Sequence, residues 1–212
     1  MKLRYLALFA LLLFFLTLPV VAGDINSSVR VGAGETVTDD LSTLNGGIRI
    51  GDGATVDGDA ESVNGGVEIG RNARVKTVSS VNGGIEIGDG TMIDGDVESV
   101  NGSISMGMRS SADSVGTVNG SLDLTGVEVA HDVSTYNGDV TLSDGTSVGG
   151  DLIIKDTNSR SSDRRRAVRI YVESGSTVMG DVIVEDKDRE VEVYLRGGTI
   201  AGEILGAKVV EK

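Results

Sequence analysis

An Asn-Gly dipeptide recurs at nearly constant intervals through the middle of the chain. Successive copies are separated by 19, 18, 19, 18 and 18 residues. A fixed period of this length is typical of solenoids, in which each repeat forms one coil and buries its apolar residues against its neighbours. The six asparagines are Asn45, Asn64, Asn82, Asn101, Asn119 and Asn137.

Within each repeat the apolar residues alternate with polar ones, which indicates short β-strands. Ile48 and Ile50 are separated by Arg49, and Ile85 and Ile87 by Glu86. Period-two alternation places one set of side chains inside and the other outside. A second motif, apolar-x-Gly-Asp/Glu-apolar, carries the repeat to the C-terminus at residues 56–60, 93–97, 148–152, 178–182 and 200–204. We therefore predict an all-β fold, a single-stranded parallel β-helix (β-solenoid) with three short strands per 18–19-residue coil and about nine coils.

The segment 85–103 illustrates one coil. We expect its interior to be formed by Ile85 with Ile87, then Ile93 with Val97, then Val100. Glycine, asparagine and aspartate lie between these apolar pairs, where the chain must turn.

The first 23 residues are typical of a secretory signal peptide. Lys2 and Arg4 precede an apolar run at 5–18, and small residues near Ala22 and Gly23 suit cleavage. The run is shorter than the roughly 20 residues that a bilayer span needs. We therefore expect an exported protein with no membrane span after cleavage. The β-solenoid domain would cover residues 24–212.

Without the signal, the chain contains no Phe, Trp, Pro or Cys, so its core must be aliphatic. Its formal charge changes from −13 to −15, because Lys2 and Arg4 are lost. A strongly acidic surface argues against nucleic acid as a partner. The polar segment 156–166 interrupts the repeat and predicts an inserted loop, and longer apolar alternation predicts wider coils over 169–212.

The Asn-Gly positions should superpose along the stack. We predict that the asparagine side chains form a hydrogen-bonded ladder, and that the dipeptide also supplies the positive φ of a tight corner. The aspartates of the other corners, including Asp52 and Asp89, resemble calcium ligands only weakly, and we interpret them as solvated turn residues. We expect no metal, no cofactor and no catalytic residue.

His131 is the only histidine. The segments 50–56 (IGDGATV) and 87–93 (IGDGTMI) resemble the hexapeptide repeat of left-handed β-helix acyltransferases. That resemblance implies a general base at His131, between subunits. The third hexad is broken wherever a coil has 19 residues, so we rank this reading last.

Four arginines in the inserted loop contrast with the acidic composition. They are a candidate contact for an anionic polymer or protein, with a solvated loop as the alternative. They are Arg160, Arg164, Arg165 and Arg166.

The sequence Ser/Thr-Val-Asn-Gly-Gly/Ser-Ile/Val-x-Ile-Gly, seen at 62–70, 80–88 and 99–107, resembles an adhesin-type β-solenoid family of secreted bacterial proteins. The Val-x-Gly-Asp-Val units are also similar to bactofilins, the polymer-forming cytoskeletal β-helices, which are cytoplasmic and have no signal. These resemblances imply a right-handed solenoid with a structural or adhesive role in the periplasm or at the cell surface. Self-assembly through the solenoid ends is one implied interaction. A binding module for a polysaccharide or envelope protein, using a solenoid face or the arginine loop, remains the alternative.

Overall fold

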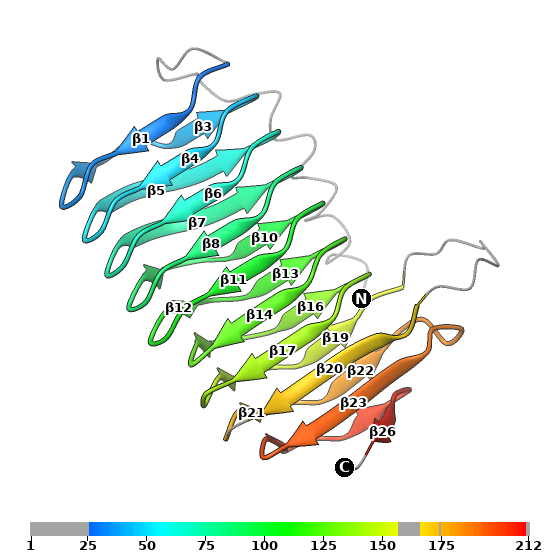
Figure 1. Ribbon diagram of the computed structural model, residues 1–212. Helices are drawn as coiled ribbons and strands as arrows, with labels where there is room; N and C mark the ends of the chain where they lie inside the picture. Colours follow the sequence, from blue (N-terminus) through cyan, green and yellow to red (C-terminus); the bar gives the residue numbers. More distant parts are fainter. Residues whose placement is uncertain (1–25, 157–165, 174, 211–212) are drawn as a thin grey trace.

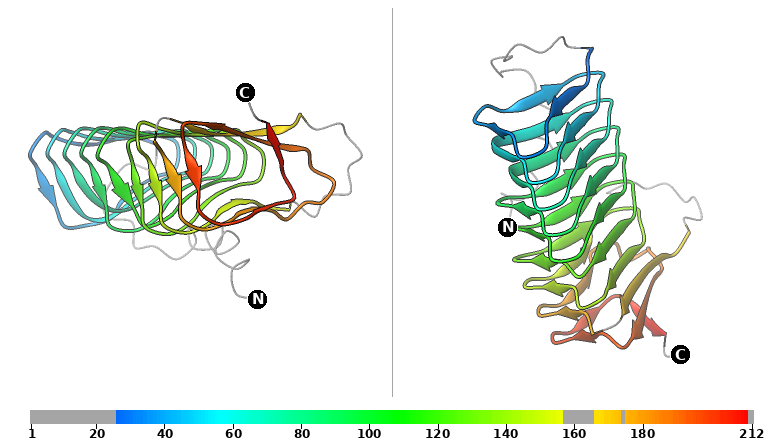
Figure 2. Two further views of the ribbon diagram at one scale, coloured as in Figure 1. Left: turned by 90° about the horizontal axis from the view of Figure 1, so that it is seen from below. Right: turned by 60° about the vertical axis from the view of Figure 1, so that its left-hand side comes forward.

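The computed structural model describes residues 26–156, 166–173 and 175–210, and within them the chain forms β-strands and no helix. All the strand pairs in the ladders are parallel, and the coils stack along one axis into a β-solenoid (Figures 1 and 2). About nine coils of roughly 19 residues are present, as the repeat predicts. The near strands in Figure 1 run towards the lower left while the coils advance towards the lower right, which is the right-handed sense.

Each coil contributes one strand to each of three ladders. The first ladder is a ten-stranded sheet made of β1 (Val29–Val31), β4 (Ile48–Ile50), β6 (Val67–Ile69), β8 (Ile85–Ile87), β11 (Ile104–Met106), β14 (Leu122–Thr125), β17 (Val140–Ser143), β20 (Val168–Glu173), β23 (Val191–Arg196) and β26 (Lys208–Val210).

The second and third ladders belong to one 16-stranded sheet, because β5 (Thr55–Ser62) and β7 (Arg74–Ser80) run through both. The second ladder also contains β2 (Thr36–Val37), β9 (Met92–Ile93), β12 (Ser111–Ala112), β15 (Glu128–Val129), β18 (Ser147–Val148), β21 (Thr177–Val178) and β24 (Thr199–Ile200). The third also contains β3 (Leu41–Thr43), β10 (Val97–Ser99), β13 (Val115–Thr117), β16 (Val133–Thr135), β19 (Leu152–Ile154), β22 (Val182–Val184) and β25 (Ile204–Leu205).

The core is one continuous aliphatic cluster that extends from Val31 to Val193. Strands of the first ladder alternate buried, exposed, buried, as in β4 and β8, so the period-two interpretation is confirmed. One expected core residue is wrong: Val100 is only partly buried, and Ser99 occupies the interior position beside it. Thr91 is also fully buried, although the sequence pattern did not mark it.

The C-terminal coils are wider, as expected, because β20 and β23 each have six residues. Tyr171 and Tyr194 stack between them with ring centroids 5.0 Å apart, and the Arg196 guanidinium lies over both rings. These coils do not fully cap the core. Leu195 and Val209 occupy positions of their strands that face the solenoid interior, but their side chains are 36% and 40% exposed.

Candidate functional site

The asparagine ladder forms as predicted. Each side-chain Nδ2 donates to Oδ1 of the asparagine one coil earlier, over 2.6–3.0 Å. The ladder has one member more than the six Asn-Gly asparagines, since Asn45 donates to Asn26. At the other end, Nη1 of Arg189 donates to Oδ1 of Asn137 over 3.2 Å. Neither Asn26 nor Arg189 stands in an Asn-Gly dipeptide, so the motif alone did not reveal them.

The glycine of each Asn-Gly dipeptide is required for close approach, and not for positive φ. These glycines have no positive φ, so that part of the expectation was wrong. A Cβ placed on Gly65 would overlap the carbonyl of Gly46 in the preceding coil, and the same holds for Gly102 over Gly83. With the exception of Gly206, the positive φ values of the described residues lie instead at the corner between the first and second ladders, for example at Gly53, where φ is 67°.

The Ser/Thr two residues before the asparagine is a hydrogen-bond donor from an interior position in the first five of the six copies, and the hydroxyl of the sixth, Thr135, is buried without a hydrogen-bond partner among the described residues. The hydroxyl of Ser62 donates to the Gly46 carbonyl over 3.0 Å, and that of Ser99 donates to the Gly83 carbonyl over 3.1 Å. Because a buried hydroxyl is costly unless it is hydrogen-bonded, this contact explains why Ser or Thr recurs at an interior position. The whole Ser/Thr-x-Asn-Gly motif therefore joins one coil to the one before it.

The Gly-Asp motif forms a second kind of inter-coil contact. Oδ1 of Asp132 accepts the backbone N–H of Asp151 over 2.9 Å, and Oδ1 of Asp151 accepts that of Asp181 over 2.8 Å. The preceding glycine is needed because a Cβ on Gly150 would overlap the Asp132 carboxylate. Asp52 and Asp89 accept backbone N–H groups in the same way. These carboxylates are therefore structural, which the interpretation as solvated turn residues missed.

A metal site has no support in the described part of the chain. There, no group of three or more His, Asp or Glu residues is placed to hold an ion.

His131 lies on an exposed corner between the second and third ladders. Its Nδ1 is 2.7 Å from Oδ1 of Asp113, and the two side chains are 68% and 44% exposed. A shallow groove of about 300 Å³ lies nearby and is bordered by Asp94, Asp113 and Glu128. To act as a general base, His131 would need a substrate whose reacting proton lies within about 3 Å of its ring nitrogen. The carboxylates that border the groove would repel an anionic acyl carrier from this position.

Carboxyl groups on the outer side of the third ladder have raised pKa values. Burial raises the pKa of Glu98, and the neighbouring Asp96 adds to the effect. Burial likewise raises the pKa of Glu61, with a further contribution from Asp59. Burial and the neighbouring carboxylates therefore disfavour the ionised forms of Glu61 and Glu98, and the cation of Lys155 offsets only part of the rise in the pKa of Glu98.

The arginine loop falls largely outside the described residues: Arg160, Arg164 and Arg165 are not among them. Arg166 is described, and its guanidinium forms an ion pair with Asp139. Asp139 also accepts the backbone N–H of Arg169 over 3.0 Å. Arg166 is thus committed to the solenoid body, and the predicted partner contact of the other three stays a prediction.

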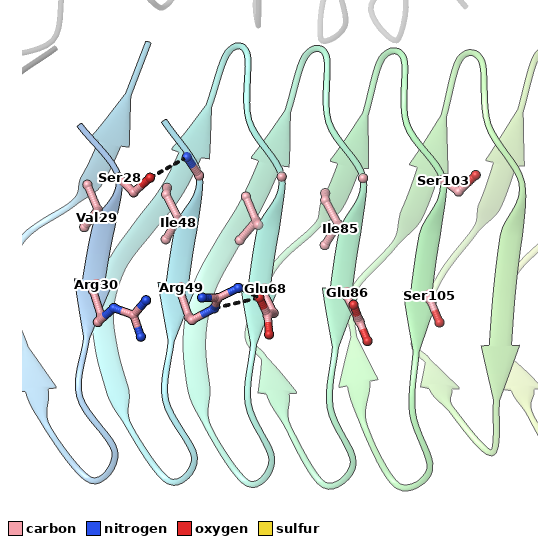
Figure 3. A pocket seen from close by; sticks show the side chains of 14 residues that line it. Ser28, Val29, Arg30, Ile48, Arg49, Glu68, Ile85, Glu86, Ser103 and Ser105 are labelled. Carbon is pink, nitrogen blue, oxygen red and sulfur yellow. Dashed lines mark hydrogen bonds and ion pairs between the residues drawn. The ribbon is translucent and has the colours of Figure 1, made fainter. Parts of the chain in front are cut away.

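The outer face of the first ladder over coils one to five contains two grooves separated by a ridge of side chains. Figure 3 shows the ridge and the residues that line the first groove. The ridge follows the strand register and consists of Arg30, Arg49, Glu68, Glu86 and Ser105. A groove of about 580 Å³ is bordered by Ser28, Gly47, Gly66, Gly84 and Ser103, and one of about 590 Å³ on the other side by Ala33, Gly51, Gly70, Gly88 and Gly107. The grooves exist because small residues occupy the strand ends in each of these five coils. We call this surface the grooved face.

Comparisons with protein-family models, with curated proteins and with solved structures found no match for this chain. The resemblances to adhesin-type solenoids and to bactofilins therefore remain predictions. The described residues contain no helix long and apolar enough to cross a membrane.

Proposed function

We propose that this protein is a non-enzymatic, exported β-solenoid with a structural or adhesin-like role in the bacterial cell envelope. The observation that carries the proposal is the use of the recurring polar residues. Apart from the Thr135 hydroxyl, the Ser/Thr, Asn and Gly of one motif make contacts between coils, as do the Gly and Asp of the other. In such a chain the repeat maintains a rigid rod, and its function lies in the rod's surfaces and ends.

Export is inferred from the sequence of the first 23 residues, with their basic start and apolar run. A fold held by repeated hydrogen bonds and aliphatic packing needs no disulfide, and the chain contains no cysteine. Such a rod is suited to an oxidising or variable environment outside the cytoplasm.

End-to-end self-assembly fits the open C-terminal end. Leu195 and Val209 occupy inward-facing positions but remain exposed, and β24, β25 and β26 are the last strands of their ladders in the described part of the chain. Exposed strand edges of this kind are templates for pairing with another chain. A second copy covering this end would remove both the apolar and the backbone exposure.

The proposal is tested by producing the full chain in bacteria and locating it by cell fractionation and mass spectrometry. We expect a product beginning near Asp24 in the periplasmic, surface or secreted fraction. Full-length protein confined to the cytoplasm would overturn the exported role.

Assembly of the purified mature chain is then followed by analytical ultracentrifugation and negative-stain microscopy. We expect end-to-end particles for the natural chain and their loss in a Leu195→Gln/Val209→Gln variant. Leu205→Gln is the matched control, because Leu205 is similarly exposed but has the outward phase. Particles that persist in the double variant would show that the open end is not the contact.

A binding module is the second candidate, and the grooved face is the observation that favours it. Its two grooves run along the solenoid axis and would accept an extended polymer. Co-sedimentation with purified cell-wall polysaccharide tests this function directly. A replacement of Arg164, Arg165 and Arg166 by alanine tests the arginine loop in the same assay.

A further inference from the structure

The ridge of the grooved face carries its charges in a self-complementary order. From coil one to coil four it reads Arg30, Arg49, Glu68 and Glu86, two cations followed by two anions (Figure 3). All four side chains are exposed. Reversing the direction of the row exchanges the cations for the anions.

The outer members of this row have no charged partner among the described residues, whereas the inner members do. Arg49 forms an ion pair with Glu68. Arg30 and Glu86 lie three strand spacings apart, about 14 Å, which is too far for direct pairing within one chain. Each therefore presents an uncompensated charge at one end of the ridge.

We propose that the grooved face binds the same face of a second copy of this chain, with the two solenoids antiparallel. A two-fold axis parallel to the strands and between β4 and β6 reverses the order of the coils. It places Arg30 opposite the partner's Glu86, and Arg49 opposite the partner's Glu68. Each pairing occurs twice, as in any interface of this symmetry.

The charges also select this orientation over its rival. A two-fold axis along the solenoid would keep the coil order and place Arg30 opposite the partner's Arg30. Like charges in direct opposition are unfavourable. The charge pattern therefore distinguishes the antiparallel dimer from the parallel one.

The other two ladders lack such a pattern over the same coils. The outward row of the second ladder has one charged residue, Arg74, among Thr36, Thr55, Met92 and Ser111. The exposed residues at the ends of these strands, Asp57, Lys76 and Asp94, follow in the order anion, cation, anion, which is not self-complementary when the coil order is reversed. The outward row of the third has only carboxylates, Glu61 and Glu98, among Ser42, Ser79 and Gly116. Either face would bring like charges or no charges together in a symmetric pair.

The shape of the grooved face permits the approach. Glycine and serine line both sides of the ridge, so the strand ends project no large side chains towards a partner. The overlap covers four coils, about 19 Å along the axis. A footprint of this size belongs to weak, reversible interfaces, in which charge complementarity mainly sets the orientation.

The inference does not depend on the proposed structural role, and its contact surface is separate from the solenoid ends. It is tested on the Leu195→Gln/Val209→Gln background, so that end-to-end association does not contribute. Sedimentation equilibrium of the mature chain should show a concentration-dependent dimer. Arg30→Glu and Glu86→Arg should each raise the dissociation constant on the order of tenfold to a hundredfold, because each converts two attractive pairs into repulsive ones.

Two combinations make the test specific. The double variant Arg30→Glu/Glu86→Arg should dimerise again, because its charges are complementary under the same two-fold axis. An equimolar mixture of the two single variants should also form a dimer, a heterodimer, although each alone is monomeric. Glu128→Arg is the control for a changed net charge, since Glu128 is exposed on the second ladder and should leave the dimer unaffected.

Three results would overturn the proposal. One is a protein with the natural ridge, on the Leu195→Gln/Val209→Gln background, that stays monomeric at millimolar concentration. Another is a double variant or mixture that fails to recover the dimer. The third is loss of polysaccharide co-sedimentation in Arg30→Glu without any dimer in the natural chain, which would assign the grooved face to a glycan.

Discussion

Replacing Gly102 by alanine should locally separate two coils. Its Cβ would overlap the carbonyl oxygen of Gly83, and the gap would have to open by about a further 0.9 Å to reach the 3.0 Å that real Cβ contacts require. The glycine has no positive φ, so the effect comes from this overlap and not from backbone conformation.

The magnitude follows from the hydrogen bonds that share this corner. The backbone N–H of Asn101 donates to Val81 over 2.8 Å, the Asn101 side chain donates to Asn82 over 3.0 Å, and the Ser99 hydroxyl donates to Gly83 over 3.1 Å. A movement of 0.9 Å would stretch all three beyond hydrogen-bonding distance. Their combined net contribution is about 3 kcal/mol, and the stiffer unfolded chain offsets about 0.5–1 kcal/mol of the loss. We expect a net destabilisation of about 2 kcal/mol or slightly more.

Urea denaturation followed by far-UV circular dichroism measures this change. For a typical slope of about 2 kcal/mol/M, the midpoint should fall by about 1 M. Gly84→Ala is the matched control, because its Cβ would lie 3.2 Å from the nearest atom, the Ser103 carbonyl oxygen. Gly53→Ala isolates the conformational effect, since φ there is 67° and no atom lies within 4 Å, and it should cost about 1–2 kcal/mol.

Equal midpoints for Gly102→Ala and Gly84→Ala would refute the reasoning. They would mean that the coils separate without cost and that the glycine is not fixed by the neighbouring carbonyl. A larger loss for Gly53→Ala than for Gly102→Ala would point to backbone conformation as the dominant requirement of the repeat.

Three further predictions concern single side chains. Asn101→Ala removes two ladder bonds and should lower the free energy of unfolding by about 1–2 kcal/mol. Asn101→Asp should lower it further, because its carboxylate replaces the donor that faces the Asn82 oxygen. A smaller loss of unfolding free energy in urea for Asn101→Asp than for Asn101→Ala would contradict the direction of the ladder. Glu98→Gln should raise the free energy of unfolding at pH 7 and have little effect near pH 4. The pKa of Glu98 is raised in the folded state, so its ionisation opposes folding as the pH rises from 4 to 7. A difference in urea midpoint that does not change with pH would argue against this. His131→Ala should leave the assembly and polymer binding of the mature chain unchanged, and a loss of either would give the exposed His131–Asp113 pair a role that the proposed function does not include.

The sequence predicted the architecture because the repeat encodes it directly. The Asn-Gly period gave the coil length and the ladder, and the alternation around Ile48 and Ile85 gave the core-facing residues. The direction of the other corner contacts was not predictable, because a single repeat does not show which atoms of the neighbouring coil lie above it. The roles of Ser99 and Asp132 become evident only once the register between coils is known.

The candidate surfaces were less predictable than the core. Arg30 and Glu86 are 56 positions apart, and only the stacking order makes them members of one row. Arg189 lies 52 residues from Asn137, beyond the inserted segment, so no local spacing connects them. Long-range neighbours of this kind depend on where insertions fall in the stack, which the period does not specify.

The asparagine ladder has an electrical consequence. Six carboxamide groups each donate an N–H to the asparagine of the coil before them, and Asn26 accepts the first of these bonds, so the dipoles of the row add instead of cancelling. The row resembles the aligned peptide dipoles of a helix, with a negative end at the Asn137 oxygen. The Arg189 guanidinium occupies that end, as a cation does at a helix C-terminus. Hydrogen bonds in such a chain polarise one another. A substitution at either end of the row should therefore change the strength of side-chain hydrogen bonds several coils away.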